Sequence, residues 1–95
     1  MKGTEKQIKW AEELKTNAIN TTKAAIQMME SMEAPAEKKA AAIAEQTRRI
    51  DVINRMACAG DVIDAFKLVD FSDTSKAVRG INAAFRGFEK FWVLD

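Results

Sequence analysis

The basic side chains near the end of the chain are the residues whose type and spacing could do chemistry. They are Lys76, Arg79, Arg86 and Lys90, and at helical pitch they gather on one side of a helix. Arg79 and Arg86 lie on one line about two turns long. Guanidinium groups so arranged could bind two phosphates or a pair of carboxylates on a partner helix. The same cations could equally form a solvated outer face, and the sequence leaves both interpretations open.

The rest of the sequence has few residues of the types that usually form catalytic or metal sites. The chain has no histidine, no tyrosine and a single cysteine, Cys58. Histidine is the commonest general base and metal ligand, and one cysteine can form neither an intrachain disulfide nor a cysteine-rich metal site. There is also no phosphate-binding loop and no nucleophile–base arrangement. We therefore expect a non-enzymatic protein with no catalytic residue, no metal site and no cofactor.

Bulk properties set the class of protein. At 95 residues the chain predicts one domain, residues 1–95, near the size at which a monomer is only marginally stable. A net charge of +1 implies no global attraction to nucleic acid or membrane. No apolar run is long enough to span a bilayer, and no signal-peptide core follows Met1. We expect a cytoplasmic protein without membrane contact.

The basic residues belong to a predicted final helix, Asp73–Lys90, which has two further stripes. Its bulky stripe holds Val78, Ile81, Phe85, Phe88 and Trp92, and its small-residue stripe holds Ala77, Gly80, Ala84 and Gly87. Glycine inside a helix costs about 1 kcal/mol relative to alanine, so two on one stripe indicate the close approach of another group. A helix crossing within the chain, a subunit contact or a ligand would each explain it. Trp92 and the apolar residues around it should dock on the body or on a second copy.

Three other helices are predicted upstream. Thr4 and Gln7 form a capping box for the first, whose apolar arc is wide enough to contact more than one neighbour. Gly60 should stop the second helix, and Asp61 should start a short third one. The main helices are then Thr4–Met32, Pro35–Ala59 and Asp73–Lys90. Short links favour antiparallel neighbours, so the sequence predicts an all-α bundle of three main helices plus one short helix, expected to be oligomeric.

Two features of the first helix have open interpretations. Trp10 lies at the edge of its apolar arc, and we expect it to be partly buried with its indole N–H bonded to a polar partner. Met28, Met29 and Met32 form a group near its end. Methionine most often fills irregular gaps in a core, but such a group can also form an adaptable binding surface.

Segments at both ends of the chain resemble a known group of proteins. The opening Gly3-Thr4-Glu5-Lys6-Gln7-Ile8-Lys9-Trp10-Ala11-Glu12 and the closing Lys90-Phe91-Trp92-Val93-Leu94-Asp95 are similar to small uncharacterised proteins of phages and other mobile elements in gut-type bacteria. Those proteins have a Gly-Ser/Thr-Glu-Lys-Gln opening with Trp-Ala-Glu, and an aromatic-Trp-Ile-Asp box near the end. Here Leu94 separates Val93 from Asp95, a departure from the closing box. The resemblance implies a bacterial cytoplasm and a phage or mobile-element genome.

Together these observations favour a small binding protein that acts by occupying a partner. The lack of catalytic groups suggests binding, and the resemblance suggests an inhibitor of a host system such as a bacterial defence complex. The alternative is a nucleic-acid or nucleotide binder that uses the basic face of the final helix. Salt separates the two, because phosphate binding weakens steeply as salt rises and an apolar protein interface does not.

Overall fold

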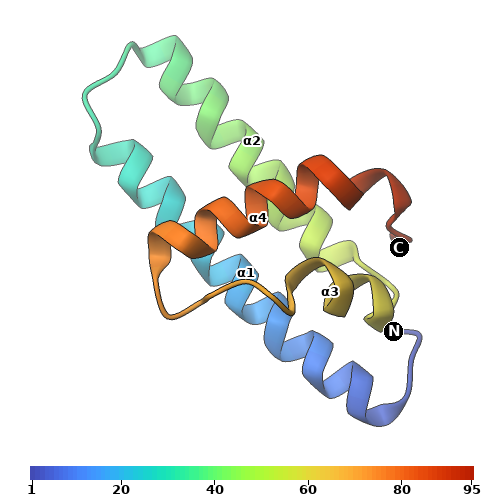
Figure 1. The fold of residues 1–95 in the computed structure, drawn as a ribbon. Helices are drawn as coiled ribbons and strands as arrows, with labels where there is room; N and C mark the ends of the chain where they lie inside the picture. The colour runs from blue at the N-terminus through green and yellow to red at the C-terminus, as the bar shows by residue number, and fades with distance from the viewer.

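The structure is a computed structural model that describes residues 1–95. Its regular elements are all helical: α1 (Glu5–Ser31), α2 (Ala36–Arg55), α3 (Ala59–Phe66), α4 (Thr74–Phe88) and a short 3-10 helix, η1 (Glu89–Phe91). α1 and α2 form a long antiparallel hairpin, and α3 and α4 lie across it (Figure 1). The predicted all-α fold of three main helices and one short helix is confirmed.

The start of two helices follows from capping side chains. Thr4 Oγ1 accepts a 3.2 Å hydrogen bond from the Gln7 amide, and Gln7 Oε1 accepts a 3.0 Å bond from the Thr4 amide. This pair is the predicted capping box, and it satisfies amides that have no partner inside the helix. At α4 the carboxylate of Asp73 accepts from the Lys76 amide at 3.1 Å. Both helices therefore begin within one residue of their predicted starts.

The end of α2 differs from the prediction. The helix stops at Arg55 instead of Ala59, and Gly60 lies inside α3 rather than ending a helix. The reason is that the residues after Arg55 make long-range backbone bonds. The Ala57 carbonyl accepts from the Lys2 amide at 2.8 Å, and the Ala57 amide donates to the Val93 carbonyl at 2.9 Å. Segments from both ends of the sequence thus hold the link between α2 and α3 in an extended conformation.

A half-buried lysine closes the same end of α2. Lys15 of α1 donates from Nζ to the carbonyls of Asn54 and Met56, both at 3.1 Å. These carbonyls lie at the negative end of the helix dipole, where a cation is stabilising. Burial lowers the pKa of Lys15, and the nearby charges of Asp95 and Glu12 act in the opposite direction.

One hydrophobic core lies where α3 and α4 cross the hairpin. Its buried members come from every α-helix and from the α2–α3 link: Ala11, Leu14, Ala18, Val52, Ile53, Met56, Ala59, Val62, Ile63, Phe66, Ile81, Ala84 and Phe85. α1 contacts the other three α-helices, as its wide apolar arc predicted, whereas α2 and α4 make no close backbone contact. None of the helices is long and apolar enough to cross a membrane.

The far end of the hairpin extends beyond this core. We call residues 26–45 the hairpin tip; it comprises the end of α1, the turn and the first half of α2. No side chain from Ile26 to Glu45 is fully buried. α4 crosses the hairpin before the tip, which therefore projects as two helices alone (Figure 1). The molecule is elongated as a result, with extents of 45 × 27 × 19 Å.

The carboxyl end of the chain is only partly docked. α4 ends at Phe88, two residues before the predicted boundary, and continues into η1. Trp92 and Leu94 pack against the core as expected. Phe91 and Val93, which alternate with them along the chain, are 68% and 57% exposed. The end of the chain thus leaves apolar surface in solvent.

Candidate functional site

The basic stripe, defined as Lys76, Arg79, Arg86 and Lys90, lies on the surface of α4 and η1. All four side chains are exposed, and none forms an ion pair. Their recorded contacts are local: Arg79 Nε lies 3.5 Å from the Ser75 carbonyl, and Lys90 Nζ lies 5.2 Å from the centroid of the Phe91 ring. The stripe is therefore free to meet an anionic group from outside the chain.

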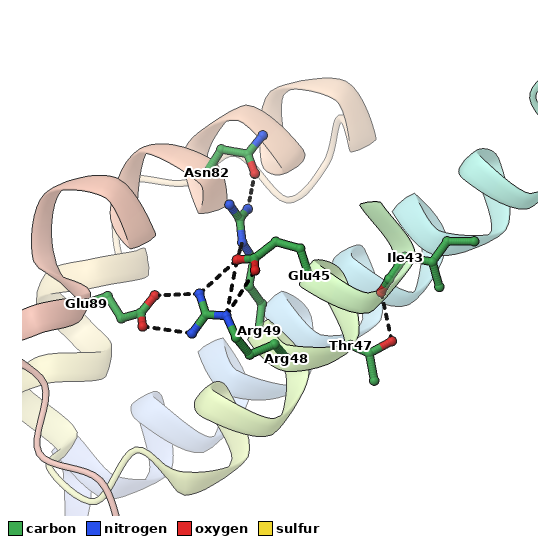
Figure 2. A network of polar contacts seen from close by, with 7 residues as sticks. All are labelled: Ile43, Glu45, Thr47, Arg48, Arg49, Asn82 and Glu89. Atoms are coloured by element: carbon green, nitrogen blue, oxygen red, sulfur yellow. Dashed lines mark hydrogen bonds and ion pairs between the residues drawn. The ribbon is translucent and has the colours of Figure 1, made fainter. Parts of the chain in front are cut away.

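The arginines of α2 are already paired with carboxylates. Arg48 of α2 donates from Nη1 and Nη2 to the two carboxylate oxygens of Glu89, at 2.8 and 2.9 Å, and also contacts Glu45 at 2.8 Å (Figure 2). Arg49 lies 3.3 Å from Glu45 and donates to Asn82 of α4. The hydrogen bonds from Arg48 hold the pKa of Glu45 and Glu89 below the usual range for a glutamate. These two arginines are satisfied within the fold.

This network has a structural role. The Arg49 guanidinium carbon lies 5.0 Å from the centroid of the Phe85 ring, and Phe85 meets Trp92 edge-on at 4.9 Å. Long side chains from α2 thereby cover the aromatic core below α4 and join two helices whose backbones do not touch. Spacing along α2 predicts Glu45 with Arg49, but nothing local in the sequence connects Arg48 to Glu89.

The small-residue stripe faces mostly into the chain. Ala77 and Ala84 are buried against the rest of the fold. At Gly80, an added Cβ would lie 3.0 Å from Val69 Cγ2, so the close approach here is made by a residue of the same chain. Gly87 is different, because a Cβ there would meet nothing within 4 Å. Trp92 packs beside Phe66 and Phe85, with ring centroids 6.1 and 4.9 Å away.

Two aromatic residues are more exposed than their sequence positions predicted. Trp10 is 46% exposed and its indole N–H donates no hydrogen bond within the chain, so the expected polar partner is wrong. Phe88 was placed on the buried stripe of the final helix but is 53% exposed. Phe88 is the last residue of α4, and its own backbone, with φ −130° and ψ −12°, already departs from the helix where η1 begins.

The methionines line two adjoining grooves, which together we call the methionine groove. The larger part, about 440 Å³, lies between α1 and the start of α4 and is lined by Ala25, Met28, Met29, Met32, Ser75, Val78 and Arg79. The smaller part, about 220 Å³, lies between α1 and α2 and is lined by Met29, Met32, Ala34, Lys38, Lys39 and Ala42. Arg79 thus belongs both to the basic stripe and to the rim of this groove. The methionines lie at the surface, not in the core.

The remaining polar residues gather into no further site. No group of histidine, cysteine, aspartate or glutamate side chains is arranged to hold a metal ion. Cys58 is a free, half-buried thiol in the link between α2 and α3. The candidate site therefore consists of the basic stripe and the adjoining methionine groove, two surfaces suited to binding. No protein-family model, curated protein or solved structure matches this chain.

Proposed function

We propose that this is a small, non-enzymatic binding protein that acts by occupying the surface of a partner protein, with the basic stripe as a contact surface. The observation that carries the proposal is the contrast between two sets of cations. Arg48, Arg49 and Arg55 are all paired with carboxylates of the chain. The four cations of the stripe are exposed and have no carboxylate partner. Cations left unpaired on one face favour association with an acidic surface.

The partner class comes from the resemblance to phage and mobile-element proteins. We propose a host protein complex in a bacterial cytoplasm, such as a defence complex, with this chain as its inhibitor. The position of Arg79 supports a protein partner over a nucleic acid, because it stands beside an apolar groove. Interfaces between proteins commonly combine arginine with methionine and other apolar side chains, whereas phosphate contacts need no apolar floor.

The test is affinity capture from bacterial lysate with the wild-type chain and with Arg79→Glu/Arg86→Glu as baits. We expect the wild type to retain a protein partner after nuclease treatment, and the double variant to lose it. Surface reversals of this kind usually change stability by about 0.5 kcal/mol or less, so helical circular dichroism and the melting temperature should stay near those of the wild type. Capture abolished by nuclease, with steep loss at raised salt, would favour the nucleic-acid or nucleotide alternative. Undiminished capture by the double variant would show that the basic stripe is not part of the interface.

We also propose that the chain self-associates through its carboxyl end. Phe88, Phe91 and Val93 are close in sequence and are 53%, 68% and 57% exposed, and exposed apolar surface at one end of a small domain favours association. Light scattering at tens of micromolar should give a mass above that of one chain, and Phe91→Asp should lower it. A monomer at that concentration would contradict the proposal.

A further inference from the structure

The hairpin tip is the part of the fold without a core. α4 covers the hairpin at Ala25 and Gln46, and beyond these residues no side chain of the tip is fully buried. Two packed helices that meet only the start of α4 at one edge leave apolar groups in water, which favours a third element on the open side. We propose that an amphipathic helix of another protein, with acidic side chains flanking its apolar face, docks in the methionine groove.

The floor of the groove is suited to a helix with bulky apolar anchors. Met28, on α1, and Met32, which directly follows the end of that helix, are 51% and 58% exposed and lie between Val78 of α4 and Ala42 of α2. Methionine is unbranched and polarisable, so a methionine floor adapts to anchors of different shape. A helix presents such anchors at spacings of three and four residues, and a groove between packed helices is a common place for them.

The rim of the groove carries charge of one sign. Arg79 comes from α4, and Lys38 and Lys39 come from α2; none of the three forms an ion pair. The nearby acids Glu30 and Glu37 do not line either part of the groove. A rim of unpaired cations around an apolar floor selects a helix whose flanks carry aspartate or glutamate.

The same rim disfavours a second copy of this chain as the occupant. In a two-fold dimer built on the groove, the positive rim of one copy would face the positive rim of the other, and like charges in an interface are costly. If the acidic residues elsewhere on the chain filled the groove instead, the contact would be head-to-tail and would tend to extend without closing. A different, acidic protein avoids both difficulties.

Synthetic helices can probe the groove directly. The docked helix would be the recognised element of the partner proposed above, so this site rests on the proposed function. The probe is a fluorescein-labelled peptide of about 16 residues, or about 24 Å of helix, with leucine anchors at i, i+3, i+4 and i+7 and glutamate flanks. One comparison peptide carries lysine flanks, and another replaces the leucines by serine. Fluorescence anisotropy with the full chain should give micromolar binding of the first peptide and at least about tenfold weaker binding of the others.

Two pairs of substitutions test the floor and the rim separately. Met28→Asp/Met32→Asp and Lys38→Glu/Arg79→Glu should each weaken binding of the acid-flanked peptide by about tenfold or more. The matched controls are Leu68→Asp, an exposed apolar residue outside the groove, and Lys23→Glu, an exposed cation of α1 outside it. Both controls should bind within about twofold of the wild type. Circular dichroism of each variant should remain helical, since the replaced side chains are not core residues.

Three outcomes would overturn the docking site. The acid-flanked peptide could fail to bind, the lysine-flanked peptide could bind equally well, or the substitutions in the groove could have no more effect than their controls. Self-association that is lost in Met28→Asp/Met32→Asp but kept in Phe91→Asp would also overturn it, because a second copy would then occupy the groove. A lysate partner that depends on Arg79 and Arg86, without any peptide binding, would leave the proposed function intact and remove only this site.

Discussion

Arg48 and Glu89 join two helices whose backbones make no close contact. The guanidinium of Arg48, on α2, donates two parallel hydrogen bonds of 2.8 and 2.9 Å to the carboxylate of Glu89 in η1. Glu45 fixes the same guanidinium from the other side at 2.8 Å. The two-point geometry orients the carboxylate and thereby holds the end of α4 over the aromatic core.

A double-mutant cycle measures this link. Arg48→Met and Glu89→Gln, alone and together, should give a coupling free energy of about 0.5–1 kcal/mol, since both partners are partly exposed to solvent. Urea unfolding of the four proteins supplies the values. Arg55 and Asp51, 3.6 Å apart within α2, provide a comparison cycle in which the coupling should be smaller. Equal coupling in the two cycles would contradict a special role for the Arg48–Glu89 contact.

The same contacts make the fold sensitive to acid. Hydrogen bonds from Arg48 lower the pKa of Glu45 and Glu89 in the folded state. An unfolded glutamate titrates at about pH 4.3, so between that pH and the lower folded pKa values the unfolded chain binds more protons than the folded one. The stabilisation is therefore fully present above about pH 5 and is lost as the pH falls through the folded pKa values. Melting curves should show this decline, and it should be shallower in Arg48→Met. If Arg48→Met lost stability with falling pH as steeply as the wild type, the Arg48 hydrogen bonds would not be the cause of the acid sensitivity.

The two glycines of the small-residue stripe should respond oppositely to alanine. Gly87→Ala meets open space and should stabilise the chain by about 0.5 kcal/mol through better helix propensity. Gly80→Ala brings a methyl group to 3.0 Å from the branched side chain of Val69, so overpacking should outweigh the same gain and destabilise by about 1 kcal/mol. Thermal unfolding of the pair tests this. Equal stabilisation by both substitutions would mean that the Val69 side chain moves aside to accommodate the added methyl group without cost.

The two tryptophans should also differ. Trp92 packs against Phe66 and Phe85, and its replacement by alanine should cost about 3–5 kcal/mol. Trp10 is 46% exposed and unbonded, so Trp10→Ala should cost about 1 kcal/mol or less. Chemical denaturation followed by circular dichroism gives both numbers. A large loss at Trp10 would indicate that its ring supports more of the fold than its exposure implies.

Local patterns in the sequence predicted the helices well. The spacing of apolar residues and the caps Thr4 and Asp73 are properties of adjacent residues, so they placed the starts of α1 and α4 within one residue. The predicted end of α2 was wrong because the Ala57 hydrogen bonds with the Lys2 amide and the Val93 carbonyl decide where the helix stops, and a local pattern contains no information about them. Helix propensity would have continued α2 through the alanines.

The candidate site was predictable only in part. Helical periodicity placed the basic stripe on one face of the final helix, and the absence of an acid between Arg79 and Arg86 favoured these two as the unpaired arginines. Whether Met28, Met29 and Met32 are core or surface depends on where α4 crosses the hairpin, which is a tertiary property. The crossing at Ala25 leaves the methionines outside the core.

The link between α2 and α3 can take its native hydrogen bonds only after both ends of the sequence have reached it. The Ala59 amide donates to the Lys2 carbonyl at 2.8 Å, and the Ala57 amide donates to the Val93 carbonyl at 2.9 Å. Each of these contacts joins residues far apart in the sequence, and closing such long loops costs conformational entropy. These contacts should therefore be among the last to form during folding. In pulsed hydrogen exchange the Ala59 amide would then report the arrival of the amino-terminal segment, and the Ala57 amide would report that of the carboxy-terminal segment.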